Sequence, residues 1–369
     1  MKNALLSLCA LALLLSFNAS AQLTNLPAPG LIPQPGPRGE GPYIPQPLFP
    51  GGIVLPLWPA DSPQLNKSRL SEPEHYSMTR GAPGRVSSIT NIHNPSIEVH
   101  TVDPGINTGA AIILVPGGGH NQLVVGTEGS DFVPFFYNYG VNTVILRYRL
   151  RKDGYKAETD AVNDAMQAVR IVRAKAADFG IDPNKIGMIG FSAGAELVAP
   201  AALFYEGFAQ TNSAADDPYR GVSPRPDFVA LLYPGPTPFT RNPQTPIPYD
   251  TPPAFLASPG SSDRIHAIWA NHYFTAMLDA GIPNLEMHIY ANGAHGNGMR
   301  DRNGSPLGTW QHRFIDWMRD LGFLGKPGEE TKAAVHVKAF VNSRSKPGPF
   351  IPNLPREPRT NRVNAPRQQ

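Results

Sequence analysis

The chain has 369 residues and a formal net charge of +3, which suits one large α/β domain with tails or two small domains. This small charge does not indicate a nucleic-acid partner. The single cysteine, Cys9, lies in an N-terminal apolar run, so we expect a mature chain without disulfides, a Cys nucleophile or thiolate metal sites.

The N-terminal residues 1–21 have the features of a signal peptide. Lys2 is the charged start, residues 4–17 are apolar, and residues 19–21 read Ala-Ser-Ala before Gln22. The apolar run is shorter than the ~20 residues that span a bilayer. We therefore expect cleavage after Ala21, a secreted or periplasmic protein and no stable membrane anchor.

Residues 22–52 are rich in proline and glycine, which favours an extended linker. The alternative is a strap docked on the folded body through apolar residues such as Leu48 and Phe49. We place the catalytic domain at residues 53–325. Residues 326–369 form a basic, proline-rich tail for which we expect disorder, with one short strand or turn near residues 333–341.

The first half of the body predicts strands and helices in alternation. Residues 86–102 suggest two antiparallel edge strands, and residues 110–115 form a continuous apolar run typical of a buried strand. Helical patterns follow at residues 127–139 and 158–179. Between them, residues 141–150 predict a strand on which Arg147 and Arg149 face outward.

The alternation continues downstream, with strands at 227–233, 253–258 and 285–290 and helices at 264–280 and 309–321. Strands alternating with helices of this length predict an α/β fold: a doubly wound, mostly parallel sheet with helices on both faces. Ligands of such sheets bind outside the carboxyl ends of the strands.

The chain is organised around Gly190-Phe191-Ser192-Ala193-Gly194, where an apolar strand turns into a helix start. A nucleophile on such a turn needs neighbours without Cβ, because strand and helix crowd together there. The N–H of Ala193 lies at a helix N-terminus and can bind an oxyanion. An ordinary Gly-Ser turn is the competing interpretation.

A serine nucleophile needs a base and a carboxylate that orients the base, and both should follow it in the order acid, then histidine. Asp263 comes just after the strand at 253–258, and His295 lies in a glycine-rich turn after the strand at 285–290. Asp263 has a structural rival role as the cap of the helix that begins at Arg264.

The glycine run 117–119 follows the buried strand at 110–115 and precedes His120. Successive glycines let the backbone approach a ligand and present N–H groups to it. A phosphate cradle is the alternative, but no P-loop Lys-Ser/Thr follows the run.

Together these residues resemble the α/β-hydrolase superfamily, and within it the secreted group of acetyl xylan and feruloyl esterases. The resemblance covers residues from about 53 to 325 and rests on the segments 115–120, 147–150, 180–187, 190–194, 225–228, 252–256 and 293–296. It implies the α/β-hydrolase fold, with Ser192 as nucleophile, His295 as base and Asp263 as its acid. It also implies an oxyanion hole built from Ala193 and Gly118 or Gly119.

The chain departs from the family pattern at two places. Ala195-Glu196 stands where relatives usually show Gly-His, and residues 258–262 stand where relatives often pair the acid with a second Asp. We expect His120 and Glu196 to contact substrate. The proline-rich loop 234–253 adds three further candidate contacts, although an ordinary surface loop is the alternative: Phe239, Arg241 and Tyr249.

The resemblance implies a serine ester hydrolase that forms an acyl-enzyme, with acetylated xylan or another acylated carbohydrate as the favoured substrate. We expect no cofactor and no metal. The alternatives are a feruloyl esterase, a general carboxylesterase or lipase, a peptidase, and a non-catalytic binding protein on the same fold.

Overall fold

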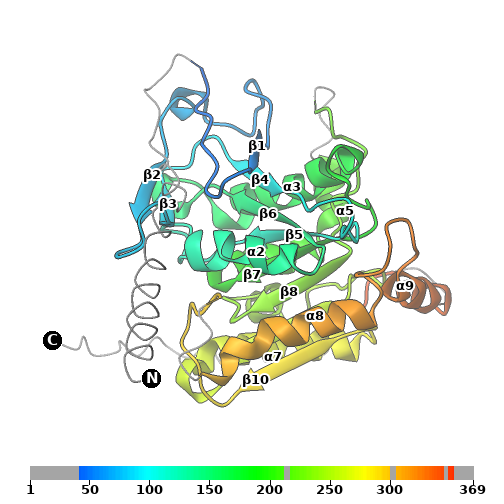
Figure 1. Ribbon diagram of the computed structural model, residues 1–369. Helices are drawn as coiled ribbons and strands as arrows, with labels where there is room; N and C mark the ends of the chain where they lie inside the picture. Colours follow the sequence, from blue (N-terminus) through cyan, green and yellow to red (C-terminus); the bar gives the residue numbers. More distant parts are fainter. Residues whose placement is uncertain (1–40, 212–216, 300–304, 345–347, 353–369) are drawn as a thin grey trace, which may run out of the picture.

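The computed structural model describes residues 41–211, 217–299, 305–344 and 348–352 (Figure 1). The predicted signal peptide lies outside these residues, as do most of the linker and the end of the tail. In the described part of the chain, no helix is both long and apolar enough to cross a membrane.

The centre of the molecule is an eight-stranded sheet in the order β1-β4-β6-β5-β7-β8-β9-β10. β1 and β4 are antiparallel to their neighbours, and all other pairs are parallel. The strands of this sheet are β1 (Ile53–Pro56), β4 (Ser96–His100), β5 (Ala111–Val115), β6 (Asn142–Arg147), β7 (Ile186–Phe191), β8 (Phe228–Leu232), β9 (Ala254–Pro259) and β10 (Glu286–Tyr290).

Helices cover both faces of the sheet, as the alternating pattern predicted (Figure 1). The α-helices are α2 (Phe132–Tyr137), α3 (Val162–Ala174), α4 (Ala195–Ala201), α5 (Tyr205–Thr211), α6 (Pro238–Arg241), α7 (Arg264–Asp279), α8 (Trp310–Asp320) and α9 (Lys332–Asn342). Aromatic contacts join α2 to α8 on one face, including Phe132 with Trp310 at 5.8 Å between ring centroids. On the other face α3 packs against α4, and α6 contacts both α4 and α7.

Short 3₁₀ or π segments lie between these elements, and several of them start a helix or follow a strand. They are η1 (Lys67–Arg69), η2 (Gly126–Ser130), η3 (Arg151–Asp153), η4 (Ala157–Ala161), η5 (Ala177–Phe179), η6 (Ser192–Gly194), η7 (Ser261–Asp263) and η8 (Pro306–Thr309).

At the edges of the fold, two expectations are wrong and one stated alternative is supported. The two strands at residues 86–102 do not pair with each other: β3 (Val86–Thr90) pairs with β2 (His75–Met78) in a separate two-stranded sheet, whereas β4 joins the main sheet. The tail does not dissolve after residue 325, because residues 332–342 form α9 and bury Ala333 and Val337. For the described end of the linker, the structure supports the alternative of a docked strap, since Leu48 is buried and Glu98 accepts hydrogen bonds from the N–H groups of Leu48 and Phe49.

The two arginines expected to face outward are buried. Arg147 donates to Glu98 at 2.7 Å, and Arg149 donates to Asp164 through Nε at 2.9 Å and Nη2 at 2.8 Å. All four side chains are at most 1% exposed. A strand pattern cannot distinguish a solvated arginine from one that is paired inside the body, because both alternate with apolar residues.

The contribution of the buried Arg147–Glu98 pair to stability depends on the charge of the Glu98 carboxylate. Burial raises its pKa, but the hydrogen bond from His100 and the charge of Arg147 outweigh that effect and the pKa of Glu98 is lowered. A lowered pKa stabilises the fold above the pKa of the unfolded chain, and the effect is lost as the pH falls through the folded value.

We expect Glu98→Gln to reduce the free energy of unfolding at neutral pH by about 3–5 kcal/mol, because Arg147 then keeps a buried charge without its closest partner. Urea unfolding at several pH values measures this, and the difference from the wild type should shrink toward acid pH. Asp316→Ala is the control, since it removes an exposed ion pair with Arg319 and should cost under about 1 kcal/mol. Equal effects of the two substitutions would contradict the prediction.

Candidate active site

Ser192 lies at the tight turn where β7 becomes η6 and α4. Its φ is +50°, in the left-handed region that non-glycine residues rarely adopt. A Cβ at Gly190 would lie 2.5 Å from the Cα of Ala195, and a Cβ at Gly194 would lie 2.0 Å from the carbonyl oxygen of Val115. The contacts confirm why both flanking positions are glycine, and they hold Ser192 at the carboxyl end of the central strand.

The structure brings Ser192, His295 and Asp263 into one chain of hydrogen bonds. The Oγ of Ser192 is 2.8 Å from Nε2 of His295, and Nδ1 of His295 is 2.7 Å from Oδ2 of Asp263. The three residues follow β7, β10 and β9, whose carboxyl ends share one edge of the sheet. Asp263 is the residue before α7, but its side chain makes no capping hydrogen bond to that helix within the described residues.

Backbone donors from the glycine run face the same turn. The N–H of Gly117 donates to Oε2 of Glu128 at 2.7 Å, so it is already used. Gly118 and Gly119 have φ of +128° and +64°, and their N–H groups donate no hydrogen bond to the described protein. With Ala193, in the first turn of η6, they are the donors left for a negatively charged oxygen.

Glu128 connects the glycine run to the loop that carries His295, and the sequence alone did not single it out. Its Oε2 binds Gly117 and its Oε1 accepts from the hydroxyl of Tyr233 at 2.9 Å. That hydroxyl accepts from the N–H of Gly298 at 2.8 Å, and the ring of Tyr233 lies edge-on to His295 at 5.1 Å. One buried carboxylate therefore links the start of the glycine run to the loop that carries the proposed base.

A second support comes from Tyr148, the residue after β6. Burial raises its pKa well above the usual value, so the hydroxyl stays protonated and donates to the carbonyl oxygen of Pro116 at 2.8 Å. Pro116 immediately precedes the glycine run. This bond and the bond from Gly117 to Glu128 hold two successive residues of the loop.

Two of the expected substrate contacts lie close to Ser192. Glu196 is in the first turn of α4, its side chain is 14% exposed, and its Oε2 accepts from Arg241 at 3.0 Å. His120 is only 2% exposed. Its Nε2 lies 3.6 Å from Glu196, and its ring nitrogens have no hydrogen bond in the described part of the chain. Glu196 remains a candidate for contact with substrate, and His120 lies beneath it.

Of the other three expected contacts, Arg241 lies beside Glu196, and Phe239 and Tyr249 are corrected by the structure. Phe239 is 1% exposed, and its ring packs against Tyr273 of α7 at 5.7 Å, so it belongs to the core. Tyr249 precedes β9 and therefore lies toward the amino ends of the strands, away from Ser192. There it contacts Phe340 of α9 at 6.0 Å, and the guanidinium of Arg344 lies 5.0 Å from the centre of its ring.

A cavity of about 400 Å³ begins at Glu196 and runs along α4. Its lining combines the exposed aromatic ring of Phe204 with charged and polar side chains, among them Glu158, Arg241 and Asn242, and with prolines of the 234–253 loop. The N–H of Gly235, in the same loop, donates to the carbonyl oxygen of Ser192 at 3.1 Å. This wall of the cavity is therefore attached to the nucleophile turn.

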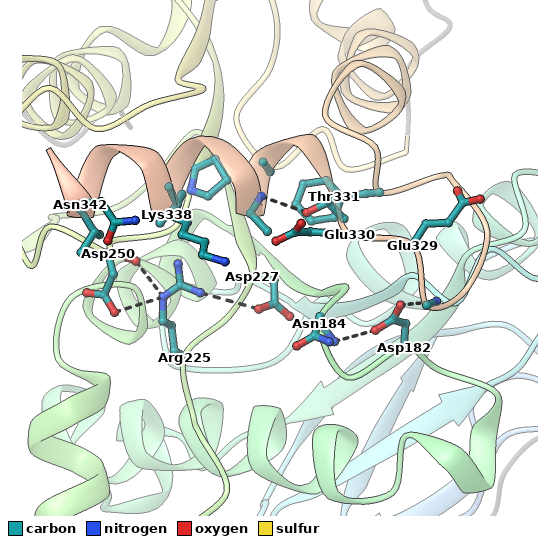
Figure 2. A pocket seen from close by; sticks show the side chains of 17 residues that line it. Asp182, Asn184, Arg225, Asp227, Asp250, Glu329, Glu330, Thr331, Lys338 and Asn342 are labelled. Atoms are coloured by element: carbon teal, nitrogen blue, oxygen red, sulfur yellow. Dashed lines mark hydrogen bonds and ion pairs between the residues drawn. The ribbon is translucent and has the colours of Figure 1, made fainter.

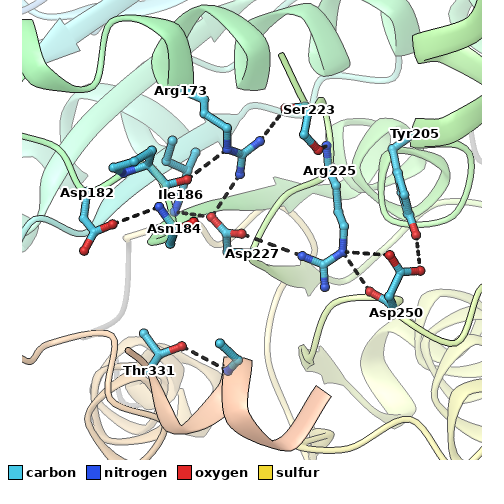
Figure 3. Close-up of polar contacts among 12 residues, drawn as sticks. Arg173, Asp182, Asn184, Ile186, Tyr205, Ser223, Arg225, Asp227, Asp250 and Thr331 are labelled. Atoms are coloured by element: carbon cyan, nitrogen blue, oxygen red, sulfur yellow. Dashed lines mark hydrogen bonds and ion pairs between the residues drawn. The ribbon is translucent and has the colours of Figure 1, made fainter. Parts of the chain in front are cut away.

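A cavity of about 610 Å³ lies at the other end of the sheet, beneath α9 (Figure 2). Its polar residues are largely occupied with one another, as Figure 3 shows. Asp227 accepts from Arg173 at 3.0 Å and from the N–H of Ile186, the first residue of β7, at 2.9 Å. Burial raises the pKa of Asp227, while the charges of Arg173 and Arg225 oppose that rise. This cluster joins the starts of the strands and is remote from Ser192.

His266 is a further member of the site that sequence reasoning missed. Its Nδ1 is 2.5 Å from Oδ1 of Asp263, and its ring lies against the ring of His295 with centroids 4.0 Å apart. Atoms of these three side chains lie within 4.8 Å of one another. Because both Nδ1 atoms already hydrogen-bond the carboxylate, we interpret the group as a hydrogen-bond set and assign no metal to it.

Comparison with known proteins points to esterases. Residues 103–221 match the model of the BD-FAE family. The chain is 29% identical over 265 residues to an acetylxylan esterase from Xylanibacter ruminicola, covering 64% of this chain and 49% of that protein. It is 31% identical over 124 residues to endo-1,4-beta-xylanase B from Butyrivibrio fibrisolvens, covering 33% and 19%. The chain thus spans half or less of the curated relatives that it matches.

Solved structures support the same fold. The crystal structure of an acetyl ester-xyloside bifunctional hydrolase from Caldicellulosiruptor lactoaceticus has a TM-score of 0.58 and 25% identity, covering 75% of this chain and 99% of that one. Esterase 2 from Thermogutta terrifontis has a TM-score of 0.55 and 20% identity, covering 76% and 98%. The predicted resemblance to α/β-hydrolase esterases is confirmed.

The link through Tyr233 can be tested by Tyr233→Phe. We expect a loss of stability of about 1–3 kcal/mol, because the N–H of Gly298 and an oxygen of Glu128 each lose a buried partner. If His295 acts as the base, kcat should also fall because its loop is less well positioned, while KM changes little. Thermal unfolding and steady-state kinetics measure the two effects.

Tyr205→Phe is the matched control for this change. The hydroxyl of Tyr205 binds Asp250 at the other end of the sheet, so its loss should reduce stability and leave kcat unaffected. A fall in kcat of equal size in both variants would contradict the positioning role of Tyr233.

Proposed function

We propose that this chain, which has the α/β-hydrolase fold, is a serine carboxylic ester hydrolase that removes acetyl groups from carbohydrate. The observation that carries the proposal is the continuous hydrogen-bond chain from Ser192 through His295 to Asp263, at 2.8 and 2.7 Å.

In this mechanism the Oγ of Ser192 attacks the ester carbonyl while Nε2 of His295 takes its proton. The N–H groups of Ala193 and of Gly118 or Gly119 stabilise the oxyanion that forms. As the carbon–oxygen ester bond breaks, His295 gives the proton to the departing alcohol. Water then attacks the acyl-enzyme with His295 again as base, and the acid is released.

Asp263 holds the tautomer that this sequence needs. Because Nδ1 of His295 donates to Oδ2 of Asp263, Nε2 is left free to accept from Ser192. The carboxylate also stabilises the imidazolium that forms during each proton transfer. The chain's own side chains and backbone thus provide for every proton and charge in the two steps.

The carbohydrate part of the proposal rests on two observations. The relatives include proteins named as an acetylxylan esterase and an acetyl ester-xyloside hydrolase. Independently, the 400 Å³ cavity beside Glu196 offers an exposed aromatic face with charged hydrogen-bonding groups around it, a combination suited to a polyhydroxylated ring. We therefore propose that this cavity takes the sugar side of the ester.

The localisation is part of the same proposal. Residues 1–21 would direct export and be removed after Ala21, so that the enzyme meets its substrate outside the cytoplasm. N-terminal sequencing of the exported protein should then begin at Gln22.

Ser192→Ala and His295→Ala should each reduce kcat/KM on an aryl acetate on the order of 10⁴-fold or more, because nucleophile and base act as a unit. For the same reason, the double variant should be scarcely worse than either single one. A fluorophosphonate should label the wild type at Ser192, as shown by mass spectrometry of the peptide. A folded wild-type protein that neither reacts with this probe nor hydrolyses any ester would refute the proposal and favour a binding protein.

Phe204→Ala should test the sugar side of the site. We expect KM for an acetylated xylo-oligosaccharide to rise several-fold, and to rise more than KM for an aryl acetate, because only the oligosaccharide reaches along α4 to Phe204. Tyr137→Ala is the control, since Tyr137 is also a partly exposed aromatic residue but lies on α2. Rates on methyl ferulate, a triglyceride and a peptide amide rank the alternative activities, and a larger kcat/KM on one of these would replace the acetylated carbohydrate.

A further inference from the structure

The carboxylate of Asp263 lies between two histidines. Its Oδ2 faces Nδ1 of His295 at 2.7 Å, and its Oδ1 faces Nδ1 of His266 at 2.5 Å. The two imidazole planes are inclined by 32° with centroids 4.0 Å apart. Only His295 also reaches Ser192, so the second histidine has no place in the proton transfers described above.

We propose that His266 is a positioning residue for the proposed triad. It holds the Asp263 carboxylate in the orientation that presents Oδ2 to His295. It also weakens the electrostatic attraction between that carboxylate and the protonated form of His295. The inference rests on the proposed esterase function and deepens it.

The hydrogen bond from His266 limits the orientations that the Asp263 carboxylate can adopt. A carboxylate held by one hydrogen bond can rotate about its last side-chain bond and exchange its two oxygens. With Oδ1 bound by His266, only Oδ2 is left for His295. The ring of His266 also covers one face of the His295 ring, and Trp269, three residues on in α7, lies edge-on to His266 at 5.1 Å. His295 is 37% exposed and sits in a glycine-rich turn, so a fixed neighbour limits its tilt.

Three titratable side chains face His266. These are Asp263 three residues before it, His295 from the loop after β10, and Glu196 from α4. Burial lowers the pKa of His266; the hydrogen bond to Asp263 opposes that fall, and the charge of His295 adds to it. A neutral His266 therefore donates its Nδ1 proton to the carboxylate at neutral pH.

That donation changes what Asp263 can do for His295. A carboxylate that accepts a second hydrogen bond has part of its charge stabilised by the donor, so it attracts an imidazolium less strongly. Any positive charge on His266 would act in the same direction, because it would repel a proton on His295. Removal of His266 should therefore make His295 hold its proton more tightly, and the acid limb of the pH profile should move to higher pH.

A purely structural role of His266 predicts a different result. If the bond between His266 and Asp263 only stabilised the start of α7, its loss would lower the melting temperature and leave the pH profile in place. Two substitutions separate these cases. His266→Phe keeps a flat ring against His295 and removes the donor, whereas His266→Asn loses the ring but keeps an N–H at a similar position to Nδ1.

The experiment measures kcat/KM for an aryl acetate against pH in the full chain, with melting temperatures as the check on folding. We expect His266→Phe to lower kcat on the order of tenfold and to move the acid limb to higher pH, and we expect His266→Asn to restore much of both. The control is His288→Phe, because His288 also binds a carboxylate, that of Glu286 at 2.7 Å, but outside the triad. Its profile should match the wild type.

A second readout does not depend on turnover. The proton shared by Nδ1 of His295 and Asp263 should give a low-field NMR resonance, and its titration in His266→Phe should be shifted to higher pH than in the wild type. Identical titrations and acid limbs in all variants, or an Asn variant no better than Phe, would overturn the inference. Lack of labelling and turnover in the wild type would instead refute the esterase, and the NMR titration would still decide the role of His266.

Discussion

The close approach of backbone segments around Ser192 is the constraint on which the rest of the structure depends. Gly190 and Gly194 lie within contact of neighbouring main chain, and a Cβ at Gly117 would lie 2.6 Å from the carbonyl oxygen of Phe191. These contacts set the nucleophile and the glycine run against each other without intervening side chains. The proposed donors for an oxyanion are consequently placed by the packing of the backbone around the end of β7.

Buried carboxylates carry this placement outward to the loops. Glu128 joins Gly117 to Tyr233 and through it to Gly298, while Asp263 joins His295 to His266. Each carboxylate accepts hydrogen bonds from two separate segments of the chain. These bonds fix the position of one loop relative to another. Such bonds have directional requirements that apolar packing lacks, which suits a site where small errors in position are costly.

The sequence predicted the parts of the site that have a local signal, and it missed those that depend on long-range contacts. Ser192 has flanking glycines, and His295 has a glycine-rich turn after a strand, so both could be placed at the carboxyl edge of the sheet. Nothing near Glu128 or His266 indicates which partners the fold brings to them. Tyr249 was misplaced although its position just before β9 already puts it at the amino edge, and α9 was discounted because its surroundings are basic and rich in proline.

The loop between β8 and β9 shows why an aromatic residue in a proline-rich segment was a poor guide to substrate contact. Phe239 is buried against α7 and attaches the loop to the core. The N–H of Gly235 donates a hydrogen bond to the carbonyl oxygen of Ser192 and attaches the loop at a second point. A loop held at both points forms a fixed wall for the cavity along α4. The hydrogen bond between Ser192 and His295 is exposed to solvent, so the proposed mechanism relies on fixed backbone donors more than on exclusion of water. That combination of a rigid wall and an accessible nucleophile suits an ester carried on an extended polymer, which must reach the serine from the side.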